Sequence, residues 1–339
     1  MSDDLVINIQ LGASVRQFFY SQLFITPTKP EYSFQGQTVI VTGSNVGLGF
    51  EAARHIYRLN AAKLILAVRT VKKGEAAKES IVKSVRHRTD GATAIEVWPL
   101  DLSSTPSTLA FAERVQSLDR VDVVVENAGI NAIQFEQAEG FEQTIQVNVL
   151  NTLLLALCVL PKIRQTKKAF PDSTAHLEIV SSEVHRFTKA PELNAPDIYA
   201  HLNDKSAFNM GRYNLSKLLE ILFIRELCSR LHDESVVITM VNPGLCKSEL
   251  DRSASFILRL FITPLRMILA RTTEVGSRTL VAGACSPDSH GQFMSDGVNQ
   301  DPEAWILTDT GKKAQLKVFE QTMKILEQRK PGISKEAGL

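Results

Sequence analysis

Short apolar runs rich in β-branched residues alternate along the chain with longer segments in which apolar residues recur at helical spacing. The short runs predict buried strands at residues 38–42, 64–68, 94–100, 121–125, 177–180, 236–241 and 292–294. The longer segments predict helices at residues 50–59, 71–85, 140–164, 212–223, 272–285 and 318–327. This alternation predicts one α/β domain, a doubly wound parallel sheet of about seven strands with helices on both faces and right-handed crossovers.

The two ends of the chain fall outside this alternation. Residues 1–35 contain an expected short helix at 15–24, rich in aromatic residues, and are then broken by prolines and a glycine. This arm could dock on the main domain, contact a second copy or lie on a membrane surface; we favour docking, because aromatic clusters more often pack than insert. The main domain spans residues 36–327, and the polar tail at 328–339 is expected to fray.

Composition narrows the class of protein. The 339 residues are 44% hydrophobic and 22% charged, with a formal net charge of +1, as in ordinary soluble globular proteins. No basic run indicates a nucleic-acid partner, and no apolar run reaches the length of about 18 to 20 residues that spans a bilayer. The acidic start lacks the features of a signal peptide. The four dispersed cysteines predict neither a disulfide framework nor a metal site, which suits a cytoplasmic protein.

A glycine-rich turn lies directly between the first expected strand and the first expected helix. Gly43 permits a tight turn, Gly47 lets the backbone approach a pyrophosphate, and Gly49 allows close packing of helix on strand. The helix N-terminus adds free N–H groups and the positive end of its dipole. The alternative is a merely tight turn, since the spacing differs from the commoner G-x-G-x-x-G pattern. In this context the turn predicts a nucleotide site, to which Asn45 and Leu48 also contribute.

The residue after the second expected strand indicates which nicotinamide cofactor is bound. An acidic side chain at this point would hold the ribose 2′-hydroxyl of NAD. The sequence instead has Arg69, followed by Lys72 and Lys73. A guanidinium can bind the 2′-phosphate of NADP in bidentate fashion. The sequence therefore predicts NADP(H), against the alternative that Arg69 lies on a solvated loop.

Tyr213 and Lys217 lie four residues apart in an expected helix, which places them on one face and one turn apart. The positive charge of the lysine favours the phenolate and lowers the pKa of Tyr213 from its reference value of about 10. A phenol tuned in this way can donate and accept a proton near neutral pH. Taken alone, such a pair is more often an exposed tyrosine and a solvated lysine, so other motifs must support this interpretation.

Polar residues also stand where the expected apolar pattern ends or is interrupted. Asp101 follows the third strand, where its carboxylate could accept from an adenine amine or cap the next helix. Asn148 interrupts an apolar helical stretch and needs partners for its amide, with structural hydrogen bonding as the alternative to function. Residues 253–270 are apolar and follow the sixth strand, so they could roof a pocket or touch a bilayer surface without spanning it.

In their order along the chain, these motifs resemble the short-chain dehydrogenase/reductase family. They are Thr42-Gly43, Gly47-Leu48-Gly49, Asp101-Leu102, Asn127-Ala128-Gly129, Asn148, Ser182, Tyr213, Lys217 and Pro243-Gly244. Each motif alone is weak, but the ordered set is specific and covers about residues 36–300. Residues 21–24 and 67–69 look most like the retinol-dehydrogenase-like branch, particularly its fungal members, many of which serve secondary metabolism.

The resemblance implies a Rossmann-type fold and a role for each matching residue. Tyr213 would be the general acid or base, and Lys217 would lower its pKa and bind the nicotinamide ribose. Ser182, rather than Ser181, would hold the substrate oxygen, and Asn148 would hold a water that relays protons by way of Lys217. The remaining cofactor contacts would be Asp101 and Leu102 to adenine, Asn127 and Gly129 to the cofactor and central sheet, and Pro243, Gly244 and Ser248 to the nicotinamide amide.

Three features depart from the family's pattern. The connection between Ser182 and Tyr213 is longer than in the commonest form, so residues 183–210 are expected to loop out and reshape the substrate entrance. Glu126 stands where the family has an uncharged residue, often asparagine. Residues 1–35 lie outside the matching region. None of these departures removes a catalytic group.

The favoured function is an NADP(H)-dependent ketone reductase or alcohol dehydrogenase that acts on an apolar small molecule, such as a secondary metabolite. One alternative is a non-redox protein on the same fold, either a cofactor sensor or a cyclase or isomerase. Another is a retinoid- or lipid-type dehydrogenase at a membrane surface. Family members commonly form homodimers through the helices that hold Asn148 and Tyr213, and this option stays open for the present chain.

Overall fold

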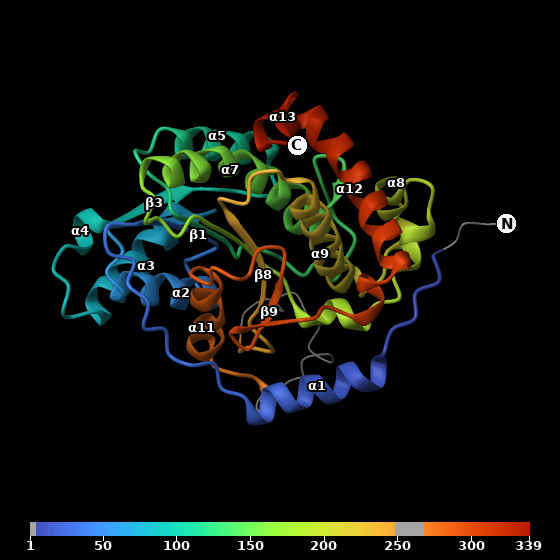
Figure 1. Ribbon diagram of the computed structural model, residues 1–339, viewed down its shortest axis with the longest axis horizontal. Coiled ribbons are helices and arrows are strands. Elements are labelled where there is room, and N and C mark those ends of the chain that lie inside the picture. The colour runs from blue at the N-terminus through green and yellow to red at the C-terminus, as the bar shows by residue number, and fades with distance from the viewer. Residues whose placement is uncertain (1–4, 248–267) are drawn as a thin grey trace.

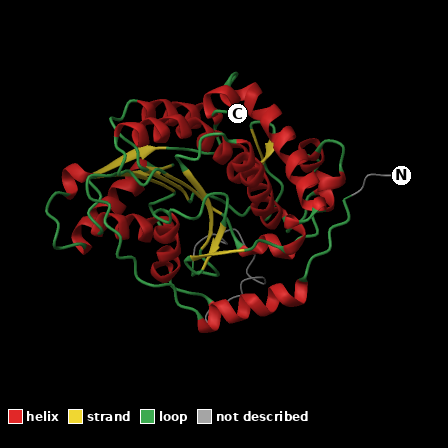
Figure 2. Cartoon of the chain, in the orientation of Figure 1, coloured by secondary structure: helices red, strands yellow, loops and turns green. Residues whose placement is uncertain are grey.

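A central sheet with helices on both sides organises the chain (Figures 1 and 2). The computed structural model describes residues 5–247 and 268–339. The strands of the sheet are β1 (Thr38–Thr42), β2 (Lys63–Val68), β3 (Ile95–Pro99), β4 (Val123–Glu126), β7 (His176–Val180), β8 (Val237–Asn242), β9 (Phe293–Ser295) and β10 (Val298–Gln300). In the described part of the chain these form an eight-stranded sheet in the order β3-β2-β1-β4-β7-β8-β9-β10. The expected doubly wound sheet is confirmed.

The sheet contains one strand more than the sequence analysis predicted. The strands from β3 to β9 are parallel, and β10 pairs antiparallel with β9. Asp296 and Gly297 connect β9 to β10 and both have positive φ, 57° and 83°. An Asp-Gly dipeptide is a strong signal for a two-residue hairpin turn. A separate short hairpin joins β5 (Gln137–Ala138) to β6 (Phe141–Glu142).

Strand β1 illustrates how the strands of this parallel sheet are buried on both faces. All five of its residues are buried. Val39 and Val41 pack into the hydrophobic cluster on one face, and Ile40 packs into the cluster on the other. A strand that is apolar on both faces fits between two helical layers, because neither face meets water.

Different helices form the two layers on either side of the sheet. Helices α2 (Gly47–Arg58), α3 (Val71–Ser84) and α11 (Thr273–Gly283) share one hydrophobic cluster with the sheet. Helices α5 (Thr105–Gln116), α7 (Thr152–Ala169) and α9 (Arg212–Arg230) share the other. The shorter helices are α4 (Gly91–Ala94), α6 (Gln143–Ile145), η1 (Gln146–Asn151), η2 (Glu183–Phe187), η3 (Pro191–Asn194), α8 (Ile198–Leu202), η4 (Lys205–Ala207) and η5 (Ala304–Leu307).

The C-terminal segment packs on the second layer. Helix α12 (Asp309–Arg329) lies against α9, and α13 (Ile333–Ala337) lies against α7. Ile333 and Ala337 are fully buried. The expectation that this tail frays is therefore wrong, because two apolar side chains anchor a last turn of helix. A homodimer formed through α7 and α9 would have to displace α12 and α13.

The segment 183–210 is a chain of short helices rather than an open loop. Tyr199 on α8 hydrogen-bonds Thr322 on α12 at 2.5 Å, and Lys317 donates to the carbonyl of Leu193 at 2.8 Å. These contacts hold most of the segment against α12. Of this segment, Glu183, Val184 and Phe187 line the main cavity. The extra length therefore builds a helical layer, and its first residues reach the site.

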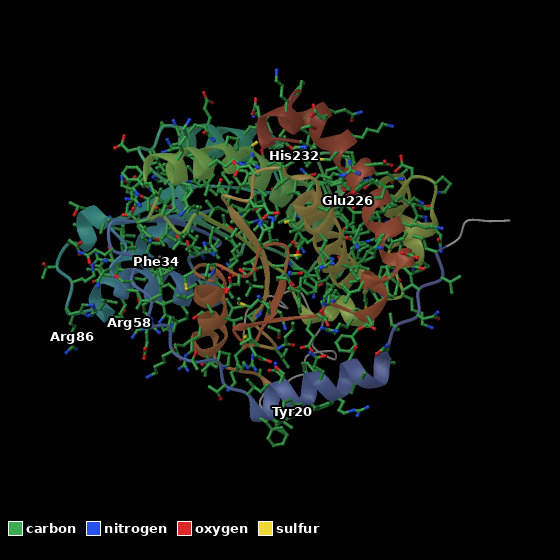
Figure 3. All side chains as sticks on the ribbon, in the orientation of Figure 1. Tyr20, Phe34, Arg58, Arg86, Glu226 and His232 are labelled. Atoms are coloured by element: carbon green, nitrogen blue, oxygen red, sulfur yellow. The ribbon has the colours of Figure 1, made fainter. Side chains whose placement is uncertain are left out.

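The N-terminal arm forms helix α1 (Leu11–Phe24), which docks on the domain through polar contacts. Ser14 donates to Glu303 at 2.9 Å, and Ser21 donates to Asp296 at 2.8 Å. Docking was expected, but the reason given was wrong: the aromatic residues Phe19, Tyr20 and Phe24 are exposed. Figure 3 shows Tyr20 pointing away from the body of the protein.

Among the described residues, one helical stretch, Gln143–Ala169, has the length and apolar composition that would allow it to cross a membrane. Within its most apolar window, 94% of the residues are buried inside the protein. Its apolar side chains are part of the hydrophobic core. The stretch therefore reads as a core helix.

Candidate active site

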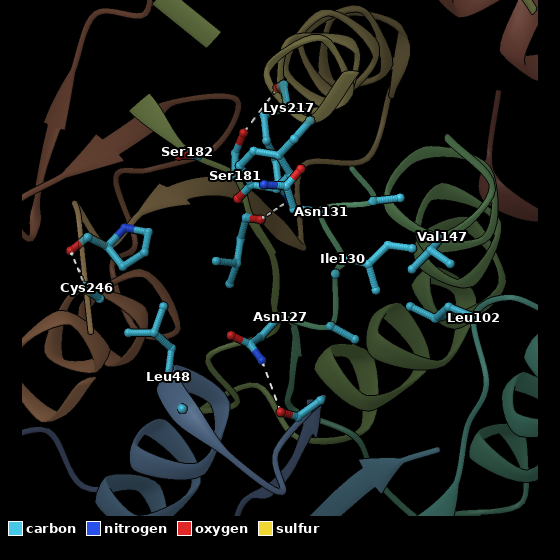
Figure 4. A pocket seen from close by; sticks show the side chains of 18 of the residues that line it. Leu48, Leu102, Asn127, Ile130, Asn131, Val147, Ser181, Ser182, Lys217 and Cys246 are labelled. Carbon is cyan, nitrogen blue, oxygen red and sulfur yellow. Dashed lines mark hydrogen bonds between the residues drawn. The ribbon is translucent and has the colours of Figure 1, made fainter. Parts of the chain in front are cut away.

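A cavity of about 870 Å³ lies at the carboxyl ends of the parallel strands, where open α/β sheets bind ligands. Figure 4 shows Lys217, Ser181 and Ser182 gathered at one side, with Asn127 and Leu48 toward the other. Its volume falls in the range of cofactor and small-molecule sites, about 300 to 1,000 Å³. The predicted site residues that line it are Gly43, Asn45, Gly47, Leu48, Arg69, Asp101, Leu102, Asn127, Gly129, Ser182, Tyr213, Lys217, Pro243 and Gly244.

The glycine turn has the geometry that phosphate binding needs. Gly43 has φ 65°, and a Cβ there would lie 2.9 Å from the Cα of Ala128. A Cβ on Gly49 would lie 2.8 Å from the carbonyl oxygen of Gly43, so helix and strand pack closely. Gly47 has φ 64° and no heavy atom within 4 Å of its Cβ position. The backbone at Gly47 is therefore open to a ligand in the cavity.

The N-terminus of α2 faces the same cavity. Its first residue is Gly47, and the capping residue Val46 makes no side-chain cap hydrogen bond. The first N–H groups of a helix lack partners within the helix, and a side chain that does not cap them leaves them for an anion. The open backbone and the free helix terminus fit the pyrophosphate of a dinucleotide.

Asn127 ties the loop after β4 to the glycine turn. Its side-chain amide donates to the carbonyl of Thr42 at 2.9 Å. The Thr42 hydroxyl accepts from the backbone N–H groups of Asn127 and Ala128 at 3.0 and 2.9 Å. These bonds fix the two loops on either side of the cavity floor relative to each other.

The loops after β2 and β3 bring charged groups to one end of the cavity. Arg69 and Lys73 are exposed and line it, whereas Lys72 does not. Asp101 accepts from the N–H and hydroxyl of Ser103, at 3.0 and 2.7 Å. The N-cap of α5 is Ser104, so Asp101 does not cap that helix. Its carboxylate stays at the cavity wall.

The two serines after β7 have different environments. The hydroxyl of Ser181 is buried and donates to the backbone carbonyl of Lys217 at 3.2 Å. The hydroxyl of Ser182 accepts from the N–H of Val184 at 3.4 Å and is half-buried at the cavity. Because the Ser181 hydroxyl is engaged by backbone, Ser182 is the better placed of the two to bind a ligand oxygen.

Tyr213 and Lys217 both come from α9, near the start of the helix, and both line the cavity. The Lys217 Nζ lies 5.8 Å from the centre of the Tyr213 ring. It donates to the carbonyl of Val180 at 2.8 Å and to Glu220 Oε1 at 2.7 Å. An ammonium has three N–H donors, so these two contacts leave one for a ligand.

Asn148 lies behind the cavity wall rather than on it. It belongs to the π-helical turn η1, a type of distortion that is frequent at functional sites. Its amide oxygen accepts from the N–H of Ile130 at 2.9 Å, and its amide nitrogen donates to the Ile130 carbonyl and to Ser216. Both amide N–H groups and one acceptor site of the amide oxygen are therefore used in structural hydrogen bonds beside Gly129.

The turn after β8 connects the cavity to the N-terminal arm. Pro243 and Gly244 line the cavity. Gly244 has φ 76°, and a Cβ there would lie 2.5 Å from the Gln22 side chain and 2.8 Å from Arg271. Ser248 and most of the apolar stretch 253–270 lie outside the described residues, so their predicted roles stay predictions.

Phe18 and Glu183 are among the cavity-lining residues that the sequence motifs did not identify. Phe18, on α1, belongs to the arm that no family motif covers. Glu183 directly follows Ser182 and is 6% exposed; burial raises its pKa to about 7, and Arg186 opposes this shift. Nothing in the sequence pointed to Phe18 as a site residue. Glu183 could have been identified, because it directly follows the predicted site residue Ser182.

Two further carboxyl groups lie buried behind the site. Glu126 ends β4, is 2% exposed, and neither of its carboxyl oxygens has a hydrogen-bond partner. Burial and the nearby charge of Glu220 raise the pKa of Glu126 well above its ordinary value. Burial also raises the pKa of Glu220 to about 7, against the opposing effect of Lys217. The sequence could have identified Glu220, because a residue three positions after Lys217 on a helix lies near it.

No group of three or more potential metal ligands occurs among residues 5–247 and 268–339. None of the four cysteines, Cys158, Cys228, Cys246 and Cys285, forms a disulfide in this part of the chain.

Comparison with known proteins agrees with this geometry. A family model described as short chain dehydrogenase matches residues 37–169. Short chain dehydrogenase/reductase dmxR8 from Cryptosporiopsis sp. (strain 8999) is 44% identical over 326 residues, which cover 94% of this chain and 98% of that protein. Short-chain dehydrogenase anuD from Penicillium roqueforti is 39% identical over 331 residues, which cover 94% of this chain and 85% of that protein.

A solved structure of an uncharacterized protein from Mycobacterium paratuberculosis has the same fold. Its TM-score is 0.60 at 25% identity, and the match covers 88% of this chain and 94% of that one. The curated relatives are fungal, which agrees with the resemblance to fungal members of the family. The chain therefore belongs to the short-chain dehydrogenase/reductase family, whose members are oxidoreductases that use a nicotinamide cofactor.

Proposed function

We propose that the protein is an NADP(H)-dependent oxidoreductase that interconverts a ketone and a secondary alcohol on an apolar small molecule. The observation that carries this proposal is that Ser182, Tyr213 and Lys217 line the same cavity as the glycine turn. A cofactor sensor would need the glycine turn but not all three polar side chains.

In the proposed mechanism, the glycine turn, Arg69 and Lys217 would hold a nicotinamide cofactor, which would supply the hydride chemistry. Ser182 and Tyr213 act on the substrate oxygen, where negative charge develops as a carbonyl is reduced. Hydrogen-bond donors aimed at such an oxygen stabilise the charge as it forms. Tyr213 gives its proton to the oxygen during reduction and takes it back during oxidation.

Lys217 supports this step in two ways. Its positive charge, 5.8 Å from the Tyr213 ring centre, favours the phenolate. Its third N–H donor is available to a ribose hydroxyl. The proposed relay water of Asn148 cannot accept a hydrogen bond from the side-chain amide, since both of its N–H groups are engaged by Ile130 and Ser216.

The cavity lining supports the choice of cofactor and substrate. Arg69 and Lys73 offer two cations where the 2′-phosphate of NADP is expected. Phe18, Val184 and Phe187 give the cavity apolar walls, which favour an apolar substrate. The fungal origin of the relatives agrees with a secondary metabolite as the substrate class that the family resemblance implied.

The proposal is tested by titrating the purified protein with NADPH and NADH and by screening apolar ketones with NADPH as the hydride donor. Tyr213→Phe should abolish turnover and leave NADPH affinity within a few-fold, because the phenol acts on substrate. A variant that still turns over ketone would refute the role of Tyr213. NADPH binding without turnover of any carbonyl would favour a non-redox function.

A second candidate, a dehydrogenase at a membrane surface, is favoured by the outward face of α1. Tyr20, Leu23 and Phe24 are all more than half exposed there. Flotation with liposomes tests it: Leu23→Glu with Phe24→Glu should release the protein if this face binds lipid. Lys324→Glu, on the exposed side of α12, is the matched control. Wild-type protein that does not float would support the predicted cytoplasmic location.

A further inference from the structure

Lys217 is held by a buried carboxylate that the proposed mechanism does not use. Glu220 lies three residues further along α9, and its Oε1 is 2.7 Å from the lysine Nζ. The two side chains are only 7% and 1% exposed. A buried opposite charge at this distance offsets part of the charge that the lysine presents to other groups.

A second carboxyl group, that of Glu126, is buried where the charge of Glu220 acts on it. Val124 and Glu126 are two residues apart on β4, so their side chains point to the same face of the sheet. Val124 packs into the cluster formed with α7 and α9. Neither oxygen of Glu126 has a hydrogen-bond partner.

Charge balance restricts the ionisation of these three groups. One lysine and one carboxylate are neutral together, but a second buried carboxylate would add an uncompensated charge, which is very costly. In the described part of the chain, Ser181 after β7 hydrogen-bonds Glu220, and Cys158 on α7 is affected by the charge of Glu126. Neither side chain supplies a positive charge, and burial raises the pKa of the Cys158 thiol to about 11.

We propose that Glu126 and Glu220 share a single proton behind Lys217 and thereby limit the positive charge that Lys217 exerts on Tyr213. In the resting protein the proton lies on Glu126, and Glu220 is the anion paired with Lys217. The two glutamates are positioning residues, since they touch neither cofactor nor substrate and act through Lys217. This inference rests on the proposed function only for the role of Tyr213.

The test follows the ionisation of Tyr213 directly. The near-ultraviolet absorbance of the phenolate is titrated against pH, and the curve of a matched protein carrying Tyr213→Phe is subtracted. The midpoint of the difference curve reports the phenol without any turnover. The same variants are then assayed for the pH dependence of kcat with the ketone found in the screen.

A shared proton gives a non-additive result. Glu126→Gln should leave the midpoint unchanged, because Glu220 still carries the one negative charge. Glu220→Gln should lower it only partly, because Glu126 can release its proton and replace the lost anion. Glu126→Gln with Glu220→Gln leaves Lys217 unopposed and should lower the midpoint by about one pH unit.

Glu178→Gln is the matched control. Glu178 is also buried without a hydrogen-bond partner, but it points to the opposite face of the sheet, beside Gly283 on α11. Its neutralisation should not move the midpoint. If the double glutamine variant does not fold, Glu126→Met with Glu220→Gln is a second neutral pair: it keeps a polar partner beside Lys217 and replaces only the carboxyl group without a hydrogen-bond partner.

Two results would overturn the inference. A downward shift from Glu126→Gln alone would mean that both carboxyls are ionised in the resting protein. A double variant with the wild-type midpoint would mean that the pair does not act on Tyr213. Failure of the proposed function is distinguishable from either, since it would appear as absent NADPH binding or turnover while the phenolate titration remains readable.

Discussion

Arg271 and Asp296 form a buried ion pair that holds helix α1 against the active-site turn. The guanidinium lies 2.5 Å from Asp296 Oδ1. The same Nη2 donates to the carbonyls of Ser21 and Ile25, at 2.9 and 3.0 Å, and Nη1 reaches the carbonyl of Pro243 at 3.3 Å. One side chain therefore connects the arm, the β9–β10 turn and the turn after β8.

Arg271→Met should detach the arm. The substitution leaves Asp296 buried without its partner, and breaking a buried pair in this way costs about 3 to 5 kcal/mol. We expect a lower melting temperature and faster proteolysis within α1 than in the wild-type protein. Arg230→Met removes a more exposed pair with Glu226 on α9 and should cost about 1 kcal/mol or less. Equal losses from the two variants would contradict an anchoring role for Arg271.

Phe18→Ala should weaken the binding of the apolar substrate. Phe18 lines the cavity from α1, and removing most of a buried aromatic side chain costs about 1 to 2 kcal/mol of binding, or roughly a tenfold rise in KM. NADPH affinity should stay within a few-fold. Tyr20→Ala, on the exposed face of the same helix, is the control. A matching loss of NADPH affinity would place Phe18 beside the cofactor instead.

Arg69→Ala should weaken NADPH far more than NADH. Hydrogen bonds to charged groups contribute about 1.5 to 3 kcal/mol, which corresponds to roughly a ten- to hundredfold loss of NADPH affinity. Fluorescence titration with both cofactors measures the difference. Lys72→Ala removes a neighbouring cation that does not line the cavity and should change neither affinity by more than a few-fold. If both cofactors lose affinity equally, Arg69 does not bind the 2′-phosphate.

The predictable parts of this protein are those set by local chemistry. Strand β1 is apolar on both faces, so a short apolar run in the sequence predicts it. The glycine turn is specified by positions where a Cβ would collide or φ is positive, as at Gly43 and Gly49. Tyr213 and Lys217 share a helix face because four residues make about one turn.

The unpredicted parts depend on contacts between distant residues. A hydrogen bond between Ser14 and Glu303, which are far apart in the sequence, holds α1 in place. Nothing near Ser14 in the sequence predicts this bond. The last helix rests on only two buried apolar residues, Ile333 and Ala337, too few to make a periodic pattern. Strand β10, by contrast, could have been predicted, because Asp296-Gly297 is a dipeptide typical of two-residue hairpin turns.

Glu178→Gln should make the protein more resistant to alkaline pH. Glu178 is fully buried on β7 and neither carboxyl oxygen has a hydrogen-bond partner. Burial raises its pKa well above the ordinary value of 4.5. A carboxyl group whose folded pKa is raised contributes its full stability below the unfolded pKa and loses it as pH rises through the folded pKa. Glutamine is neutral at every pH and has no such loss.

Thermal unfolding at several pH values between about 5 and 8.5 measures this effect. The melting temperature of the variant relative to wild type should be higher at the upper end of that range than at the lower end. Glu75→Gln removes an exposed carboxylate on α3 and should give a difference that does not depend on pH. A variant whose difference from wild type falls as pH rises would mean that the ionised carboxylate of Glu178 is stabilised in the folded protein. Cys285, whose thiol pKa is raised to about 12 by burial and by Glu178, stays protonated throughout and does not confuse the measurement.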